Sequence, residues 1–482
     1  MVTLVKEKLG DAKLIVASNR EPYMHVWRGE EIKTVRPASG MAVALDSIMQ
    51  ACGGTWVAHG AGDADQEVVD EENVIEVPQK NPKYRLKRVW MTKKEEQGYY
   101  DITSNELFWP LCHTVYVRPK FNERAWNEYK KINQRFANAI LEEIGDEQAF
   151  IWFQDFHLSL APRMIKNKKQ DLVTAHFWHI PWPQNETFRA CPWKHKILDG
   201  LLANDLIGFH TRYHCNNFLE TVDRNLVSKT DRSEYSVLYK HKKTYVKPFP
   251  ISVDYHKIKK MAEEPERQKT IKPIKHRLNL ENKVVGVGVE RVDYTKGIPE
   301  KLKALEWFLE KNPQYKEKLT YIQIGSPSRL RLEEYRSINE EIEELVEDIN
   351  WRQGTKKWTP IIYLSEHHDF EDIINYYMLA DFCIVSSLHD GMNLVAKEYI
   401  SSKTNADGML ILSRFTGAQE ELTDALLVNP YDTRRFAAVI KKLLTLKAEK
   451  KKERMQKLRD IVEENNIYTW AGNIVSNISK IA

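Results

Sequence analysis

The sequence predicts an α/β protein made of two open domains built on parallel sheets, and three observations support this prediction. The chain has 482 residues, which is too long for a single hydrophobic core. Short apolar runs alternate with helical stretches, as in parallel strands joined by crossover helices. The segment 246–250 carries two prolines and follows the charged stretch 239–243, which indicates a domain boundary near residue 250.

The predicted strands form two sets, one on each side of this boundary. The first set is 14–18, 55–58, 150–154, 173–177 and 206–209. The second set is 284–289, 321–324, 361–364, 382–385, 409–412 and 426–428. After about residue 440 the sequence is helical and highly charged. Ligands of open α/β sheets bind beyond the carboxyl ends of the strands, so we expect the two domains to face one another across a cleft.

Composition excludes several classes of function. Lys and Arg number 72 against 68 Asp and Glu, a net charge of +4, so neither nucleic acid nor an anionic membrane is an expected partner. The five cysteines are far apart and never form a CxxC pair, which indicates a reducing compartment and no structural zinc. Residues 1–6 lack the apolar core of a signal peptide, and no run approaches the about 18 apolar residues of a membrane helix. We expect a soluble, cytoplasmic protein.

The stretch from Asp390 to Glu398 follows the predicted strand 382–385 and contains Gly391. A strand that passes through a glycine-containing turn into a helix presents backbone N–H groups and the positive end of a helix dipole. Such a terminus binds phosphate or diphosphate. Asp390 has a second interpretation, because Asp also caps helices well.

The stretch from Glu290 to Gly297 leaves the strand 284–289 with two cations, Arg291 and Lys296. Fixed Arg and Lys charges on a departing phosphate can take the place of a metal ion. The alternative is a surface ion pair with Glu290 and Asp293. Together with the stretch after 382–385, these cations suggest a glycosyl transferase that uses a nucleotide-activated sugar.

Three other motifs are weaker. Gly286-Val287-Gly288 fails as a dinucleotide fingerprint, because Arg291 stands where the third glycine belongs. No GxxxxGK[ST] occurs, which disfavours a P-loop enzyme. Asp63-Ala64-Asp65 looks like an Asp-x-Asp metal site, but its loop is rich in Gly and Asp, which is typical of a turn. We predict no metal.

At these residues the chain resembles the trehalose-6-phosphate synthase family, retaining glycosyltransferases with two Rossmann-like domains in the GT-B fold. The resemblance runs from about residue 15 to about residue 470. Its motifs are Ser18-Asn19-Arg20, Trp109-Pro110, Gln154-Asp155-Phe156-His157, 179–183, 205–209, 290–297 and 390–398. We expect an acceptor-binding domain at residues 1–248, a nucleotide-sugar domain at 249–465, and a C-terminal helix at 466–482 that returns to the first domain.

The resemblance implies specific roles in donor binding. Arg291 and Lys296 would hold the diphosphate, Glu398 the ribose, and Asp390 the hydroxyls of the transferred glucose. The donor set it implies is Gly40, Arg291, Lys296, Asp390, Gly391, Met392, Asn393, Leu394, Val395 and Glu398.

The resemblance also implies an acceptor set. Arg20, Tyr100 and Arg329 would hold the acceptor phosphate, with the Trp109 ring alongside. Asp155 and His179 would face the sugars from the first domain. The resemblance implies catalytic roles for Asp155, His179, Arg291, Lys296 and Asp390.

Four departures from the family pattern alter mainly the acceptor half. Ser39-Gly40 stands where a Gly-Gly pair is usual, and His59 replaces an aromatic residue of the acceptor pocket. Gln154-Asp155 replaces a His-Asp pair, and the loop 21–36 looks longer than usual.

The implied activity is metal-independent, retaining transfer of glucose from a nucleoside diphosphate glucose to glucose 6-phosphate, which forms trehalose 6-phosphate. The nucleotide sugar is a substrate, and no cofactor is expected. Because His59 replaces an aromatic residue of the acceptor pocket, a different acceptor, for example glycerol 3-phosphate, is an alternative. A non-catalytic regulatory homologue is a further alternative, although the complete donor set argues against it. The donor base (UDP, GDP or ADP) and a homo-oligomeric state stay open.

Overall fold

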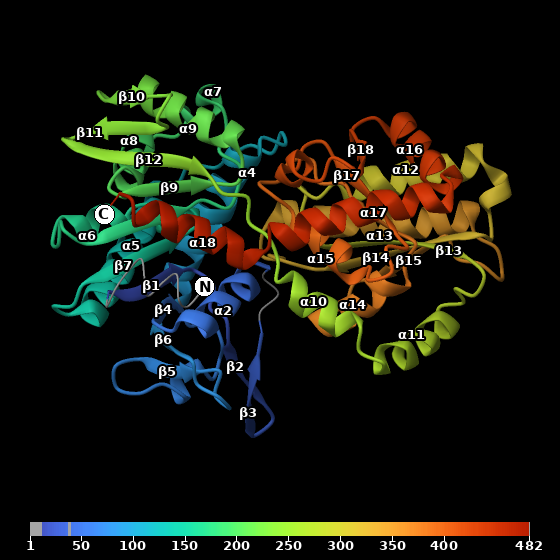
Figure 1. The fold of residues 1–482 in the computed structure, drawn as a ribbon, viewed down its shortest axis with the longest axis horizontal. Coiled ribbons are helices and arrows are strands. Elements are labelled where there is room, and N and C mark those ends of the chain that lie inside the picture. Colours follow the sequence, from blue (N-terminus) through green and yellow to red (C-terminus); the bar gives the residue numbers. More distant parts are fainter. Residues whose placement is uncertain (1–11, 37–39, 482) are drawn as a thin grey trace. The chain divides into compact units, whose positions relative to one another are not determined.

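The computed structural model describes residues 12–36 and 40–481. Residues 1–6, which were expected not to form a signal peptide, and Ser39, which replaces a glycine of the family pattern, therefore lie outside the described residues. The described chain forms two compact units (Figure 1). One contains the residues up to Ile251 together with those from Ile467 onward, and the other is Ser252–Asn466.

The first unit is built on a sheet of 10 described strands in the order β10-β11-β12-β9-β8-β7-β1-β4-β6-β5. Its central strands are parallel: β1 (Lys13–Ser18), β4 (Thr55–His59), β6 (Tyr84–Val89), β7 (Ala149–Gln154), β8 (Val173–Phe177), β9 (Leu206–Phe209) and β12 (Lys242–Pro248). Antiparallel strands complete its edges: β5 (Val74–Val77), β10 (Lys229–Asp231) and β11 (Ser236–Tyr239). The carboxyl ends of the central strands therefore share one edge, where the site residues of this unit lie.

The helices of the first unit follow or connect these strands. They are α2 (Gly40–Cys52), α3 (Lys93–Glu96), α4 (Trp109–His113), α5 (Glu123–Ile144), α6 (Ala161–Lys166), α7 (Asn185–Phe188), α8 (Lys194–Leu201) and α9 (Arg212–Asn225). A π-helical segment, η2 (Gln97–Phe108), joins α3 to α4. Short 3₁₀ turns occur at η1 (Asp65–Glu67) and η3 (Phe156–Leu158).

Seven described strands of the first unit were not predicted from the sequence: β2 (Met24–Arg28), β3 (Glu31–Val35), β5, β6, β10, β11 and β12. The loop 21–36 contains an antiparallel hairpin, β2 with β3. The segment around residue 246 is strand β12, which pairs with β9, rather than a linker. These strands were missed because charged residues interrupt or flank their short apolar stretches, even in β6 and β12, which lie inside the sheet.

The second unit is built on six described parallel strands in the order β15-β14-β13-β16-β17-β18. They are β13 (Val284–Arg291), β14 (Leu319–Ser326), β15 (Ile361–Leu364), β16 (Phe382–Val385), β17 (Met409–Ser413) and β18 (Leu426–Val428). Gly286 in β13 is a packing residue, since an added Cβ would lie 2.4 Å from the Phe382 ring. This close approach gives the Gly-x-Gly pattern a structural reason unrelated to nucleotide binding.

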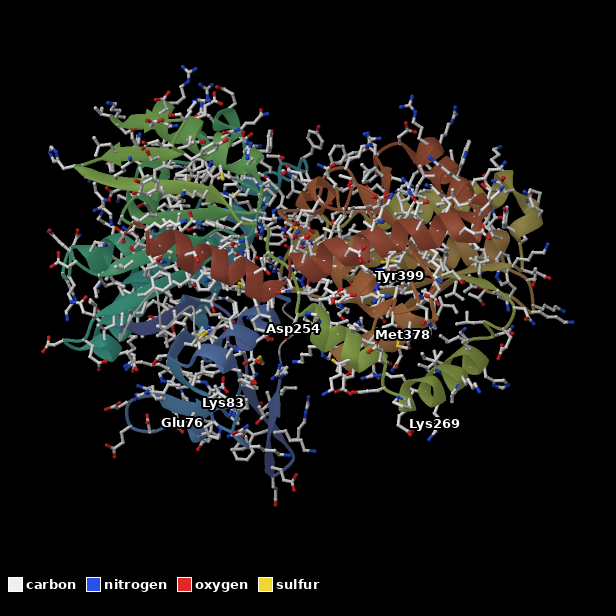
Figure 2. All side chains as sticks on the ribbon, in the orientation of Figure 1. Glu76, Lys83, Asp254, Lys269, Met378 and Tyr399 are labelled. Carbon is white, nitrogen blue, oxygen red and sulfur yellow. The ribbon has the colours of Figure 1, made fainter. Side chains whose placement is uncertain are left out.

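The helices of the second unit connect these strands or pack on the helices that do. They are α10 (Tyr255–Ala262), α11 (Glu266–Arg277), α12 (Ile298–Lys311), α13 (Glu333–Gln353), α14 (Phe370–Leu379), α15 (Leu394–Ser402), α16 (Thr433–Thr445) and α17 (Ala448–Glu464). A short 3₁₀ turn, η4 (Pro313–Tyr315), follows α12, and another, η5 (Gly417–Glu420), follows β17. Asp254, labelled in Figure 2, starts α10 by accepting the Lys257 N–H at 3.1 Å.

Helix α18 (Ile467–Ile478) packs on the first unit, although it follows the second in the chain. The Trp470 ring lies 5.0 Å from the Trp152 ring and donates its N–H to the Phe249 carbonyl at 3.1 Å. Lys247 donates to the Asn477 side chain at 2.8 Å.

None of the five cysteines, all of which are described, forms a disulfide. In the described residues, no helix has the length and apolar character needed to cross a bilayer.

Candidate functional site

In the second unit, the end of β13 carries the first group of candidate residues. Arg291 is the last residue of β13, and Gly297, with a φ of 63°, is the N-cap residue directly before α12. A Cβ at Gly297 would lie 2.3 Å from the Ser386 carbonyl oxygen, so this tight turn requires glycine. The turn places Lys296 directly before the helix, at the carboxyl edge of the sheet.

Asp293 organises the cations of this turn. Its buried carboxylate lies 3.2 Å from Arg329 and accepts the Thr295 N–H at 3.0 Å. Burial raises the pKa of Asp293, but the charges of Arg329, Lys296 and Arg291 outweigh burial and hold the pKa below its usual value. From the sequence alone, Asp293 was a candidate only for a surface ion pair. It is fully buried, and its place inside the 290–297 motif was the available signal.

Glu290 does not pair with either candidate cation. Its carboxylate is buried and lies 2.7 Å from the ammonium group of Lys301. Gln323 also donates to it at 2.8 Å. The alternative of a surface ion pair involving Glu290 is therefore wrong, because Glu290 is used inside the unit.

The turn after β16 carries the second group. The Asp390 carboxylate accepts the Lys296 ammonium at 2.7 Å, and Ser387 and Asn393 donate to it at 3.2 Å each. Lys296 and Asp390 are 94 residues apart in the chain. The tertiary structure therefore brings the two predicted halves of the donor site together.

Asn393, rather than Asp390, caps helix α15. Its φ is 108°, and its side chain accepts the Ala396 N–H at 3.1 Å. The capping interpretation of Asp390 is therefore wrong, because its carboxylate contacts Lys296, Ser387 and the Asn393 side chain instead. Gly391, Met392 and Asn393 are buried, whereas Leu394 and Val395 are half-buried. These residues lead into the amino-terminal turn of α15, where backbone N–H groups and the helix dipole favour an anion.

Glu398 lies one turn further along α15. Tyr377 donates to its carboxylate at 3.1 Å. Burial raises the pKa of Glu398 to about 7, against a smaller lowering by the Tyr377 hydrogen bond. The group can therefore be ionised or neutral near neutral pH.

The remaining predicted residues divide between the two units. Arg329 belongs to the second unit, where it donates to Tyr335 at 2.6 Å and has a φ of 52°. The other predicted acceptor residues, and Gly40 at the exposed start of α2, belong to the first unit.

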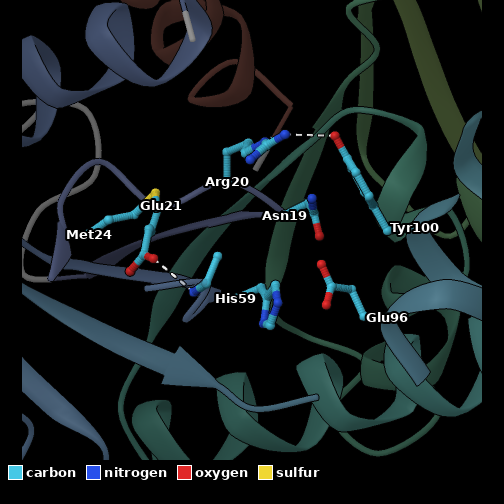
Figure 3. A pocket seen from close by; sticks show the side chains of 8 residues that line it. Asn19, Arg20, Glu21, Met24, His59, Glu96 and Tyr100 are labelled. Carbon is cyan, nitrogen blue, oxygen red and sulfur yellow. Dashed lines mark hydrogen bonds between the residues drawn. The ribbon is translucent and has the colours of Figure 1, made fainter. Parts of the chain in front are cut away.

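A pocket in the first unit contains two of the predicted acceptor residues (Figure 3). Arg20 donates to the Tyr100 hydroxyl at 2.7 Å, and its guanidinium lies 5.2 Å from the centre of the Tyr100 ring. The residues lining this pocket are Asn19, Arg20, Glu21, Met24, His59, Ala61, Glu96 and Tyr100. Asn19 and Glu96 were not singled out as candidate residues from the sequence.

Asp155 and His179 lie together at the ends of β7 and β8. The Asp155 carboxylate accepts the backbone N–H of His179 at 3.1 Å, and Asp155 has a φ of 66°. The Nε2 atom of His179 lies 2.8 Å from Oε1 of Gln154. Because an amide oxygen only accepts hydrogen bonds, Nε2 carries the proton and Nδ1 is left as an acceptor. Burial and the neighbouring histidines hold the pKa of His179 well below its usual value, so its ring is neutral.

Trp109 is more buried than its predicted role suggests. It is 6% exposed and packs against the rings of His113 and Phe156 at 4.1 and 6.3 Å. It is not among the residues lining the pocket around Arg20. Its position beside the acceptor stays a prediction.

Asp63 and Asp65 shape the turn that was predicted for them. Asp65 is buried and lies 2.8 Å from Arg88, and its carboxylate accepts the Gly62 N–H at 2.7 Å. Asp63 accepts the backbone N–H of Trp27 at 2.9 Å. Across the described part of the chain, no group of three or more His, Cys, Asp or Glu could hold a metal ion.

Comparison with known proteins points to one family. The model of glycosyltransferase family 20 matches residues 12–480. The UDP-forming α,α-trehalose-phosphate synthase of Candida albicans is 33% identical over 474 residues, which cover 97% of each chain. A solved E. coli structure described as bound with UDP-2-fluoro glucose is 30% identical, with a TM-score of 0.87 over 98% of this chain and 100% of that one. The Burkholderia xenovorans synthase in complex with glucose-6-phosphate is 26% identical, with a TM-score of 0.87 over 97% of this chain and 100% of that one.

Proposed function

This chain belongs to glycosyltransferase family 20, and on that premise we propose that it is a retaining glucosyltransferase acting on UDP-glucose and glucose 6-phosphate. The products are trehalose 6-phosphate and UDP. The family and the GT-B fold agree with the resemblance found in the sequence. UDP is proposed as the nucleotide because the Candida albicans relative is named UDP-forming.

The observation that carries this proposal is the convergence of Lys296 and Asp390 beside the amino terminus of α15. A nucleoside diphosphate leaves with negative charge, which Arg291 and Lys296 offset at the end of β13. The first turn of α15 adds N–H donors and a favourable dipole. Glu398 would accept hydrogen bonds from the ribose hydroxyls when it is ionised.

The Lys296–Asp390 ion pair has a chemical consequence. When the donor binds, the ammonium gains the diphosphate as a partner, and the Asp390 carboxylate gains glucose hydroxyl donors. Ser387 and Asn393 keep the carboxylate in place during this exchange. Leaving-group stabilisation then comes from fixed charges that require little reorganisation.

Retention of configuration is proposed to occur by front-face displacement. In this step the bond between the anomeric carbon of glucose and the leaving phosphate oxygen breaks, and the acceptor hydroxyl oxygen bonds to that carbon on the same face. The leaving phosphate takes the proton of this hydroxyl. Neutral His179 would then act as a hydrogen-bonding group toward the transferred glucose, and Asp155 would hold its backbone.

We also propose that the reaction needs no metal ion and takes place in the cytoplasm. The first proposal is supported by the cations at the end of β13 and by the use of Asp63 and Asp65 within their own turn. The second is supported by five cysteines that form no disulfide.

The test is to incubate the purified protein with UDP-, GDP- and ADP-glucose, each with glucose 6-phosphate or glycerol 3-phosphate. Products are identified by mass and by the anomeric couplings in their proton NMR spectra. We expect an α,α-linked disaccharide phosphate from UDP-glucose and glucose 6-phosphate. His59 in the acceptor pocket is the reason to include glycerol 3-phosphate. A preference for it would replace the acceptor assignment, and no transfer with any pair would contradict the enzymatic proposal.

A further inference from the structure

The pocket around Arg20 has a cationic side and a side rich in hydrogen-bond acceptors. In Figure 3, Arg20 and Tyr100 lie on one side, with His59 and Glu96 on the other and Asn19 between them. Arg20 and Tyr100 are the proposed phosphate ligands. The side chains of Asn19, His59 and Glu96 have no assigned contact with the substrates in the proposed function.

Glu96 differs from its neighbour Glu95. Glu95 is buried, closes the capping box of α3 and lies 2.8 Å from Arg135. Glu96 is half-buried and lines the pocket. Within residues 12–36 and 40–481, its carboxylate forms no hydrogen bond or ion pair. Glu95 therefore holds the helix, while Glu96 offers an uncompensated carboxylate to whatever occupies the pocket.

His59 adds a second acceptor. Its Nδ1 lies 3.0 Å from the Val89 carbonyl oxygen, so Nδ1 carries the proton and donates it. Burial holds the pKa of His59 below its usual value, so the ring is neutral and Nε2 keeps its lone pair. Glu96 and Arg20 are both close enough to influence this pKa.

Asn19 adds a third acceptor. It is only 6% exposed, and its Oδ1 is buried without a hydrogen-bond partner among the described residues. A buried polar atom of this kind normally has a partner. Because Asn19 lines the pocket, a bound molecule with hydroxyl groups can supply the missing donor.

Hydrogen bonds of Glu21 hold the part of the pocket that lies next to His59. The Glu21 carboxylate accepts the Ala61 N–H at 2.9 Å and the Arg88 guanidinium at 3.0 Å. Glu21 therefore links the segment that follows His59 to Arg88 of β6. Glu21 is a positioning residue for the pocket wall.

We propose that the hydroxyl groups of the acceptor donate hydrogen bonds to Asn19, His59 and Glu96. These contacts would orient the acceptor with its phosphate toward Arg20. This inference rests on the proposed function, since it takes the pocket to be the acceptor site. Three acceptors in one region favour ligand groups that donate, namely hydroxyls. The charge of Glu96 disfavours ligands that carry a second anionic group on that side. The pocket therefore selects a neutral polyol monophosphate.

The experiment compares the equilibrium binding of glucose 6-phosphate and 6-phosphogluconate, measured by calorimetry, in the parent and in Glu96→Gln. The second ligand adds a carboxylate at the end opposite the phosphate. A lost charge-assisted hydrogen bond weakens glucose 6-phosphate about 10-fold. Removal of a partly screened repulsion strengthens 6-phosphogluconate about two- to fivefold.

Glu106→Gln is the matched control. Glu106 lies in η2, pairs with Lys120 at 2.9 Å and does not line the pocket. The control makes the same change in net charge and should leave both affinities unchanged. A structural effect of Glu96→Gln would weaken both ligands by the same factor, whereas the proposal predicts opposite directions.

Equal shifts for the two ligands, or no shift in either, would overturn the inference. Failure of the parent to bind either phosphosugar would overturn it as well. If the parent binds glucose 6-phosphate but no donor is turned over, the proposed function fails. The ratio of the two affinities then decides the inference independently.

Discussion

Replacement of Lys296 by Met tests the donor site most directly, because it removes the ammonium but keeps most of the apolar stem. The ammonium lies 2.7 Å from Asp390 in a pair whose side chains are 13% and 15% exposed. Loss of one partner from a fully buried pair costs about 3–5 kcal/mol. Asp390 keeps the donors Ser387 and Asn393, so we expect a smaller loss of stability, about 1–2 kcal/mol.

The effect on turnover should be larger than the effect on stability. A fixed donor to a developing anion is worth about 2.7–4 kcal/mol, which lowers kcat by about 10²- to 10³-fold. Initial rates with UDP-glucose measure this loss, and urea denaturation followed by circular dichroism measures stability. Lys303→Met is the control, since Lys303 is 50% exposed and pairs with Glu341 on the surface of the second unit. It should alter neither quantity appreciably.

The double variant Lys296→Met/Asp390→Asn separates substrate contact from a purely structural pair. If the pair only stabilises the fold, removing both charges should restore turnover to within about threefold of the parent. If both groups contact the donor, the double variant should be no faster than Lys296→Met. Recovery of turnover in the double variant would refute the assignment of Lys296 to the leaving group.

Three further predictions concern the acceptor, the metal and pH. Arg20→Ala and Arg329→Ala should raise the acceptor KM about 10- to 100-fold, with nucleotide affinity, measured by calorimetry, hardly changed; the reverse pattern would show that the two binding sites were exchanged. Activity should survive excess chelator, and Asp63→Asn should stay active, whereas Asp65→Asn should lower the melting temperature because it breaks a buried pair with Arg88; loss of activity in chelator that magnesium restores would contradict this. The pKa of Glu398, about 7 when folded and 4.5 when not, means that its contribution to stability is complete below pH 4.5 and is lost as pH rises through 7. The free energy of unfolding, relative to Glu398→Gln, should therefore fall by about 3 kcal/mol across that window in denaturation curves, and a parallel pH dependence in the two proteins would contradict the shift.

The sequence predicted most of the buried parallel strands, but it missed β6, a buried parallel strand that carries three cations. Segments 173–177, 206–209, 361–364, 382–385 and 426–428 are strands with those same limits. These parallel strands are covered on both faces, so they appear as continuous apolar runs with clear ends. The hairpin β2–β3 and the edge strands β10 and β11 lack such runs, because solvent contacts them.

The candidate site was predictable where one short segment supplies its chemistry. The segment from Glu290 to Gly297 carries two cations at the end of an apolar run, and the segment from Asp390 to Glu398 forms the turn before a helix. The roles within these segments were less predictable. Asp293 is buried and holds cations, and Asn393 caps the helix, because such roles depend on partners brought in by folding.

The sequence by itself determined the α/β class, the family and the two segments of the donor site, because these depend on local periodicity and on residue types at fixed spacing. Only the tertiary structure decided which side chains meet. Arg20 reaches Tyr100 across 80 residues, and Lys296 reaches Asp390 across 94. Glu95 and Glu96 are adjacent and chemically alike, yet one is buried against Arg135 and the other faces a pocket. Their roles differ because the two side chains point in different directions and contact different distant elements. Neither property follows from the residue type alone.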